Sequence, residues 1–237
     1  MTSKALLFPR AARELAAIGR RFYARGWVLG TSGNFSAVVS RTPLRLAITA
    51  SSLPKGTLRP ADILQCDENG RVMGRASKRP SAETLLHIEI AKRRSAGAVL
   101  HTHSVWSTML SDAPSSGSDA HVAIEGYEML KGLAGVTSHE HRELVPIVDN
   151  NQDMPRLAAR VGDMLERHPA SHAFLLKRHG LYTWGDTLAD AERHVEILEF
   201  LFEAMGRART DANGRPRSEA RHGDRANSGR ESSASRR

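Results

Sequence analysis

Two histidines separated by one residue, His101 and His103, have the types and spacing that point most directly to chemistry. They follow the apolar run 98–100, which is typical of a short buried strand. Because alternate residues of a strand project from one face, both imidazoles point the same way. Neutral imidazole is a common zinc ligand, and His179, placed between two strand-like runs, could supply a third. The spacing alone also fits histidines that bind no metal.

Short helical and extended segments alternate along the chain and must position these histidines, which indicates an α/β or α+β fold. Periodicity and turn residues predict two kinds of element. The helices are expected at 9–25, 81–94 with Ser81 as N-cap and Glu83 in the first turn, 105–110, 125–133, 154–167 and 188–207. The strands are expected at 34–39 and 45–49, 63–66 and 71–73 as hairpins, then at 98–100, 172–176 and 181–184.

The composition is typical of a folded globular domain and not of a membrane protein or a disordered chain. Of 237 residues, 40% are hydrophobic and 25% are charged, and no run approaches the roughly 18 apolar residues of a membrane span. The first residues lack the apolar core of a signal peptide, so we expect a cytoplasmic protein without a membrane partner. A single cysteine, Cys66, excludes an internal disulfide and a paired-cysteine zinc site.

The formal net charge of +8 is concentrated at the end of the chain. Residues 207–237 contain nine arginines and four acids, which leaves only +3 for residues 1–206. This segment is rich in Arg, Ser and Gly and poor in apolar residues, so it cannot bury enough surface to fold. We therefore expect one catalytic domain over 1–206 and a disordered Arg/Ser-rich tail over 207–237, and we do not expect nucleic acid as the partner.

Five segments resemble the class II aldolase/adducin family and occur in that family's order. They are GTSGNFS (30–36), ITASS (48–52), RPSAETLLH (79–87), AVLHTHS (98–104) and KRHGLYTWGDT (177–187), within a resemblance that covers residues 4–206. The resemblance implies a three-layer α/β fold whose central mixed, largely antiparallel sheet is flanked by helices. It also implies one Zn²⁺ per subunit on His101, His103 and His179, and a homo-oligomer, commonly a cyclic tetramer with active sites near subunit boundaries.

Two glutamates are candidates for proton transfer. The segment GYEMLKGL (126–133) is similar to that of the family's dehydratases, whose acid/base glutamate corresponds to Glu128. In the family's aldolases the glutamate of a Ser-x-Glu segment acts beside the metal, which makes Glu83 the rival. Dehydrating a ketose phosphate requires removing a proton beside the carbonyl and expelling a hydroxyl, steps that a carboxylate near zinc can assist. Each glutamate also has a non-catalytic interpretation. Glu128 could be a solvated residue of a helix, and Glu83 could be a first-turn carboxylate that the helix dipole stabilises.

Phosphate recognition needs backbone N–H groups, hydroxyls and a cation. The family's phosphate-binding loops match Gly33, Asn34, Ser51, Ser52 and Ser81, with Lys55 or Lys131 adding positive charge. Ala82 stands where aldolases tend to carry a second hydroxyl, so the phosphate site must differ in detail. His87 is expected in the core or behind the metal ligands, and His139 and His141, a second pair with one residue between, in a surface loop.

Three functions remain open from the sequence. The first is zinc-dependent dehydration of a small sugar phosphate. The second is a sugar-phosphate aldolase or epimerase that uses the same zinc-stabilised enediolate. The third is a non-catalytic adducin-like binding module, which should have lost the three histidines that this chain keeps.

Overall fold

The computed structural model describes residues 6–112 and 120–214. The helices are α1 (Phe8–Ala24), α2 (Thr84–Arg93), α3 (Val105–Leu110), α4 (Met154–Arg167) and α5 (Leu188–Gly214), with short 3-10 turns η1 (Lys55–Thr57), η2 (Pro60–Asp62) and η3 (Glu128–Gly132). The strands are β1 (Asn34–Arg41), β2 (Leu44–Thr49), β3 (Ile63–Asp67), β4 (Ala98–Thr102), β5 (His121–Ile124), β6 (Glu143–Val148), β7 (Ala173–Leu176) and β8 (Gly180–Gly185).

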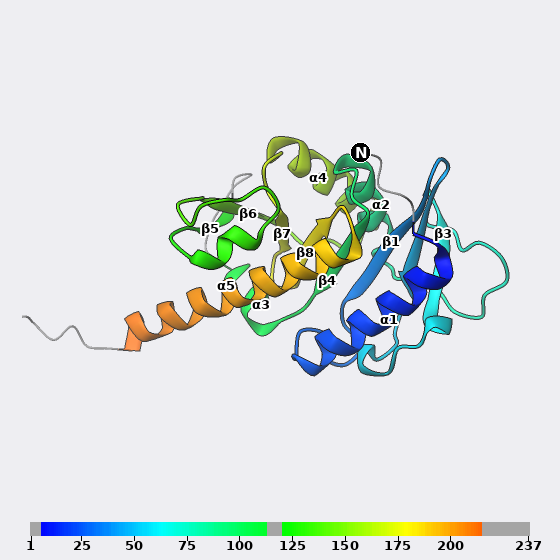
Figure 1. The fold of residues 1–237 in the computed structure, drawn as a ribbon, viewed down its shortest axis with the longest axis horizontal. Helices are drawn as coiled ribbons and strands as arrows, with labels where there is room; N and C mark the ends of the chain where they lie inside the picture. The colour runs from blue at the N-terminus through cyan, green and yellow to red at the C-terminus, as the bar shows by residue number, and fades with distance from the viewer. Residues whose placement is uncertain (1–5, 113–119, 215–237) are drawn as a thin grey trace, which may run out of the picture.

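In this described part, eight strands form a single mixed sheet in the order β3-β2-β1-β4-β8-β7-β6-β5 (Figure 1). The pair β6 and β7 is parallel, and the other neighbours are antiparallel. The predicted mixed, largely antiparallel sheet is therefore confirmed. Strand β4, which carries the first histidine of the HxH pair, lies in the middle of the sheet between β1 and β8.

Helices cover both faces of the sheet and give three layers (Figure 1). Alternation along β4 sends Ala98 and Leu100 into a core with α1 and α5, and Val99 into a core with α2 and α4. Residues of α1 at helical spacing, such as Leu15 and Phe22, are fully buried, and each such side chain contributes about 1.5–3 kcal/mol. The sheet centre is thus rigid where the histidines emerge.

Several predicted elements differ from the observed ones. The helix expected over 125–133 is wrong, because Gly126 adopts φ +78° and only the 3-10 turn η3 follows it. Strands β5 and β6 were not predicted. The expected second strand of the hairpin, 71–73, makes only a single bridge from Val72 to Cys66. Helix α2 begins with Glu83 in the N-cap position, so the expected cap at Ser81 and the first-turn place of Glu83 are also wrong.

Helix α5 continues to Gly214, past the boundary expected at residue 206. Residues 215–237, the rest of the expected tail, lie outside the described residues. Within the described ranges, no helix combines the length and apolar character needed to cross a bilayer.

Candidate metal centre

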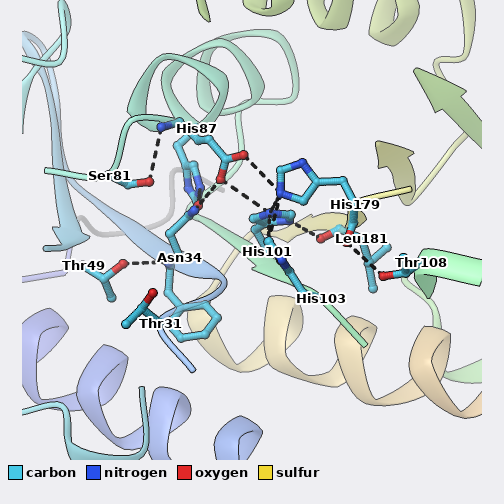
Figure 2. A network of polar contacts seen from close by, with 12 residues as sticks. Thr31, Asn34, Thr49, Ser81, His87, His101, His103, Thr108, His179 and Leu181 are labelled. Carbon is cyan, nitrogen blue, oxygen red and sulfur yellow. Dashed lines mark hydrogen bonds and ion pairs between the residues drawn. The ribbon is translucent and has the colours of Figure 1, made fainter. Parts of the chain in front are cut away.

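Sheet register brings the three histidines of the predicted metal site together. Asn34 of β1 and Tyr182 of β8 are the residues directly opposite His101 in the neighbouring strands. His103 follows β4 by one residue, and His179 immediately precedes β8, which pairs with β4. Figure 2 shows the imidazoles of His101, His103 and His179 converging on one point.

The Nε2 atoms of the three imidazoles lie close to one another. They are separated by 2.7 Å between His101 and His103, 3.0 Å between His103 and His179, and 3.3 Å between His101 and His179. The Nδ1 atom of His101 lies 2.8 Å from the carbonyl oxygen of Leu181, which can only accept, so this nitrogen carries the proton. In neutral His101 the Nε2 lone pair therefore faces the other two histidines, as a metal ligand requires.

Burial favours the neutral, ligating form of His101 and His103. His101 is fully buried, and this burial, followed by the neighbouring histidines, holds its pKa well below the usual value. Burial likewise lowers the pKa of His103 to about 3. Tyr182 stacks on the His101 ring with centroids 3.8 Å apart and prevents it from turning. Three converging imidazoles suit a divalent cation.

Glu83 is the carboxylate that lies beside the histidine cluster. Its Oε2 is 3.5 Å from Nε2 of His101, and its Oε1 is 3.5 Å from Nε2 of His179. Asn34 donates to Oε2 from Nδ2 at 2.6 Å, and its Oδ1 accepts from Nε2 of His87 (Figure 2). The structure thus gives Asn34 a role in orienting Glu83, whereas the sequence indicated a phosphate contact.

His87 lies behind Asn34, as the sequence led us to expect of a residue that supports the site. It is fully buried, and burial lowers its pKa to about 3. Its Nδ1 accepts from the Ser36 hydroxyl at 2.7 Å while Nε2 donates to Asn34. This chain of hydrogen bonds fixes both the Asn34 amide and the Glu83 carboxylate that the amide contacts.

An open pocket of about 250 Å³ lies next to the cluster and collects most of the predicted binding residues. A bridge between Ala50 and Pro80 joins the loop after β2 to the segment before α2. This brings the hydroxyls of Ser51, Ser52 and Ser81 to one place. The predicted residues that line the pocket are Gly33, Asn34, Ser51, Ser52, Ser81, Glu83, His103 and His179.

Lys55 adds a buried cation to the same pocket. Its side chain is 1% exposed, and its Nζ donates to the carbonyls of Thr31 and Leu53, both at 2.9 Å. Burial lowers its pKa to about 8, so the amine is largely protonated at neutral pH. The sequence offered Lys131, with Lys55 as the alternative, and the pocket is lined by Lys55 and not by Lys131. Thr31 and Ser32, which belong to the GTSGNFS segment, also line the pocket. So do Gln152 and Met154, which have no spacing or motif that sequence reasoning could have used.

The structure places Glu128 and Lys131 elsewhere. Both lie on η3, where Lys131 donates to Glu128 at 2.7 Å, and the Glu128 side chain is 73% exposed. The hydrogen bond from Lys131 lowers the pKa of Glu128 and favours its ionised form. Neither residue lines the pocket, so the described chain brings Glu83 to its own histidines and does not bring Glu128 there.

The sequence and the fold match known proteins. A family model described as "Class II Aldolase and Adducin N-terminal domain" matches residues 13–205. The chain is 49% identical over 197 residues to the methylthioribulose-1-phosphate dehydratase of Methylococcus capsulatus, covering 83% of this chain and 93% of that protein. It is 44% identical over 201 residues to the protein of the same name from Pseudomonas savastanoi pv. phaseolicola, covering 84% and 96%.

Solved structures share the fold at lower sequence identity. YgbL from Escherichia coli aligns with a TM-score of 0.70 and 24% identity, covering 88% of this chain and 92% of that one. An L-fuculose-1-phosphate aldolase from Thermus thermophilus aligns with a TM-score of 0.64 and 21% identity, covering 86% and 96%. These alignments identify the three-layer architecture.

Proposed function

Because the chain belongs to the class II aldolase and adducin family, we propose that its histidine cluster is the centre of a dehydratase of methionine salvage. The reaction converts 5-methylthioribulose 1-phosphate to 2,3-diketo-5-methylthiopentyl 1-phosphate and water. Relatives of that name at 44–49% identity support the substrate. The observation that carries the proposal is the cluster of three converging imidazoles with Glu83 beside it, opening onto a pocket of hydroxyls and a cation.

The proposed metal is zinc, one ion per subunit, held by Nε2 of His101, His103 and His179. The family uses divalent metals, and three imidazole nitrogen ligands with room for a fourth group favour zinc over magnesium or calcium. Zinc bound there would polarise the substrate's C2 carbonyl and stabilise the negative charge left when the C3 proton departs. The protein holds one of the three ligands, His101, in place through the Leu181 carbonyl and the Tyr182 ring.

The pocket hydroxyls and Lys55 bind the phosphate in this proposal. Ser51, Ser52 and Ser81 can donate to phosphate oxygens, and Gly33 leaves its backbone open to close approach. Lys55 uses two of its three N–H donors on carbonyls, so one remains for an anion. A phosphate held here places the adjacent C2 and C3 atoms toward the histidines, which line the same pocket.

Glu83 is the group that removes the C3 proton in this mechanism. Its carboxylate is fixed by Asn34 and lies 3.5 Å from two ligand nitrogens, within reach of a substrate bound at the cluster. Glu128 then assists the departing C4 hydroxyl. Since Glu128 is exposed and absent from the pocket of its own chain, it acts in the site of a neighbouring copy in the homo-oligomer, for which a tetramer is our expectation.

Mixing two inactive variants tests this division of roles. Glu83→Gln and Glu128→Gln chains, unfolded and refolded together, form mixed oligomers in which some sites combine an intact Glu83 with a neighbour's intact Glu128. Random mixing should restore up to about one quarter of wild-type activity. If one chain supplies both glutamates, every site keeps one defect and mixing restores nothing.

The product distinguishes dehydration from the other chemistry that this cluster supports. An aldolase would break the C3–C4 bond of the same substrate and release dihydroxyacetone phosphate, and an epimerase would return an isomer. Zinc-loaded protein should give the diketone and water, and dihydroxyacetone phosphate as the product would overturn the proposal.

A non-catalytic adducin-like module is the alternative from another class, and metal content tests it. Such a module has no need for three converging histidines, whereas the described chain brings them together and fixes His101 through the Leu181 carbonyl. Wild-type protein should retain about one zinc at the cluster after dialysis, and His101→Ala should lose it. A wild-type protein that retains no zinc would favour the binding module.

A further inference from the structure

A second group of metal-ligating side chains lies away from the pocket. It consists of His141 in the loop before β6, Glu143 at the start of β6, and His172 just before β7. Oε2 of Glu143 is 2.8 Å from Nε2 of His141 and 2.9 Å from Nδ1 of His172. These separations fall in the range found among the three histidines of the first cluster, 2.7–3.3 Å.

Neighbouring backbone groups orient two of these side chains as metal ligands are oriented. Nε2 of His172 lies 2.8 Å from the carbonyl oxygen of Ala134, so it carries a proton and directs Nδ1 toward Glu143. The backbone N–H of His172 donates to Oε1 of Glu143 at 2.9 Å, which leaves Oε2 to face the two imidazoles. One oxygen and two nitrogens therefore converge, and Glu143 and His172 already have their outer partners in place.

The nearby His194 is not a further ligand. Its Nδ1 donates to the carbonyl of Trp184 at 2.7 Å, and its Nε2 accepts from the backbone N–H of Ala134 at 3.1 Å. Both nitrogens are thus occupied. His194 accepts from the backbone N–H of Ala134 and His172 donates to its carbonyl oxygen, so the two histidines together bind the backbone of this residue, which follows η3.

We propose that His141, Glu143 and His172 form a second site for a divalent metal ion of the zinc class. Two imidazoles and one carboxylate are a ligand set that zinc accepts. Glu143 is 1% exposed, and a buried carboxylate is stabilised by a cation. The His141 side chain is 30% exposed, which gives an ion a path in and leaves solvent for a fourth ligand. Burial alone would lower the pKa of His172, but the hydrogen bond to Glu143 outweighs burial and raises it.

The site has a structural role in this proposal and is independent of the proposed reaction. It joins the loop 134–142, which follows η3, to the first residues of β6 and the residue preceding β7. Bound metal would hold this loop on the sheet and raise the midpoint of thermal unfolding, because an ion that binds only the folded chain stabilises it.

Metal content of variants tests the proposal, with zinc and cobalt as the probes. Full-length wild type dialysed against micromolar zinc should hold two ions per chain, His101→Ala one, and His101→Ala combined with His141→Ala none. His139→Ala is the matched control, because His139 lies in the same loop with a 57% exposed side chain and is outside the cluster. That control should keep both ions. Cobalt bound to His101→Ala should give visible absorption bands that His141→Ala removes.

Glu143→Gln provides a second variant that keeps the shape of the side chain. In the His101→Ala background it should lose the remaining ion and the zinc-dependent rise in melting temperature, while circular dichroism reports whether it folds. The proposal is overturned if His101→Ala holds no metal at saturating zinc, or if its metal content and cobalt spectrum survive both His141→Ala and Glu143→Gln. The cluster is then only a hydrogen-bonded ion pair.

Discussion

Replacing Gly33 by alanine should damage the histidine cluster, whereas the same change at Gly30 should not. Both glycines have positive φ, +72° at Gly33 and +61° at Gly30, so both substitutions place a side chain in the left-handed region. A Cβ at Gly33 would lie 2.6 Å from Cγ1 of Val28 and 2.7 Å from the carbonyl oxygen of His101. A Cβ at Gly30 would meet nothing within 4 Å.

These contacts separate the free-energy cost of the left-handed backbone conformation, which both variants have, from the cost of overpacking, which only Gly33→Ala has. The left-handed conformation costs alanine about 1–2 kcal/mol, and the reduced entropy of the unfolded chain offsets about 0.4–1 kcal/mol of it. Gly30→Ala should therefore destabilise the protein by about 1 kcal/mol. Gly33→Ala adds overpacking of about 1–3 kcal/mol, because the backbone at His101 must shift. That shift moves a metal ligand and should weaken zinc binding by about 10- to 100-fold, as changes around ligands do.

Urea unfolding of the metal-free proteins measures the first effect, and zinc titration against a competing chelator measures the second. Gly30→Ala should keep wild-type zinc affinity despite its lower stability. If the two variants lose equal stability and both bind zinc as wild type does, then the contact between Gly33 and His101 does not position the ligand.

Three further substitutions test the proposed site and the helix behind it. Glu83→Gln should keep zinc and lose about 10²- to 10⁴-fold in kcat, and turnover within tenfold of wild type would remove the base role from Glu83. Lys55→Met should raise KM by about tenfold or more through loss of a charge-assisted hydrogen bond, and an unchanged KM would exclude a phosphate contact. Glu199, 2% exposed, accepts from Thr102 Oγ1, and burial raises its pKa to about 7. Wild type should therefore lose on the order of 3 kcal/mol of stability relative to Glu199→Gln as pH rises from 4.5 through 7, because the folded state holds this proton more tightly. Urea unfolding measures the loss, and a parallel pH dependence of the two proteins would show that folding does not raise the pKa of Glu199.

The histidine pair could be predicted from the sequence because its geometry is local. An apolar run followed by His101 and His103 specifies a strand end and a common face without reference to the rest of the chain. His179 is 76 residues further on, and the local pattern places it only between two strand-like runs. Its arrival depends on β8 pairing with β4, which no local pattern predicts, and the full ligand set came from the family resemblance. The orientation of Asn34 toward Glu83 and His87 likewise depends on contacts between distant segments.

The errors also have local physical causes. Apolar spacing favoured a helix around Glu128, yet the left-handed Gly126 precedes it and the chain makes only a 3-10 turn. Strand β5 is four residues long and too short for a reliable alternation pattern. The exposed position of Glu128 could not be predicted from the sequence. Its segment resembles that of the dehydratases equally well whether Glu128 acts in the pocket of its own chain or in that of a neighbouring chain.

The most direct test of the proposed function is ³¹P NMR of one sample of zinc-loaded protein with 5-methylthioribulose 1-phosphate. The substrate resonance should be replaced by that of the diketone phosphate, with no dihydroxyacetone phosphate, and His101→Ala should leave the substrate unchanged. Substrate that persists with zinc-loaded wild type, or conversion that survives in His101→Ala, would contradict a dehydratase centred on these histidines.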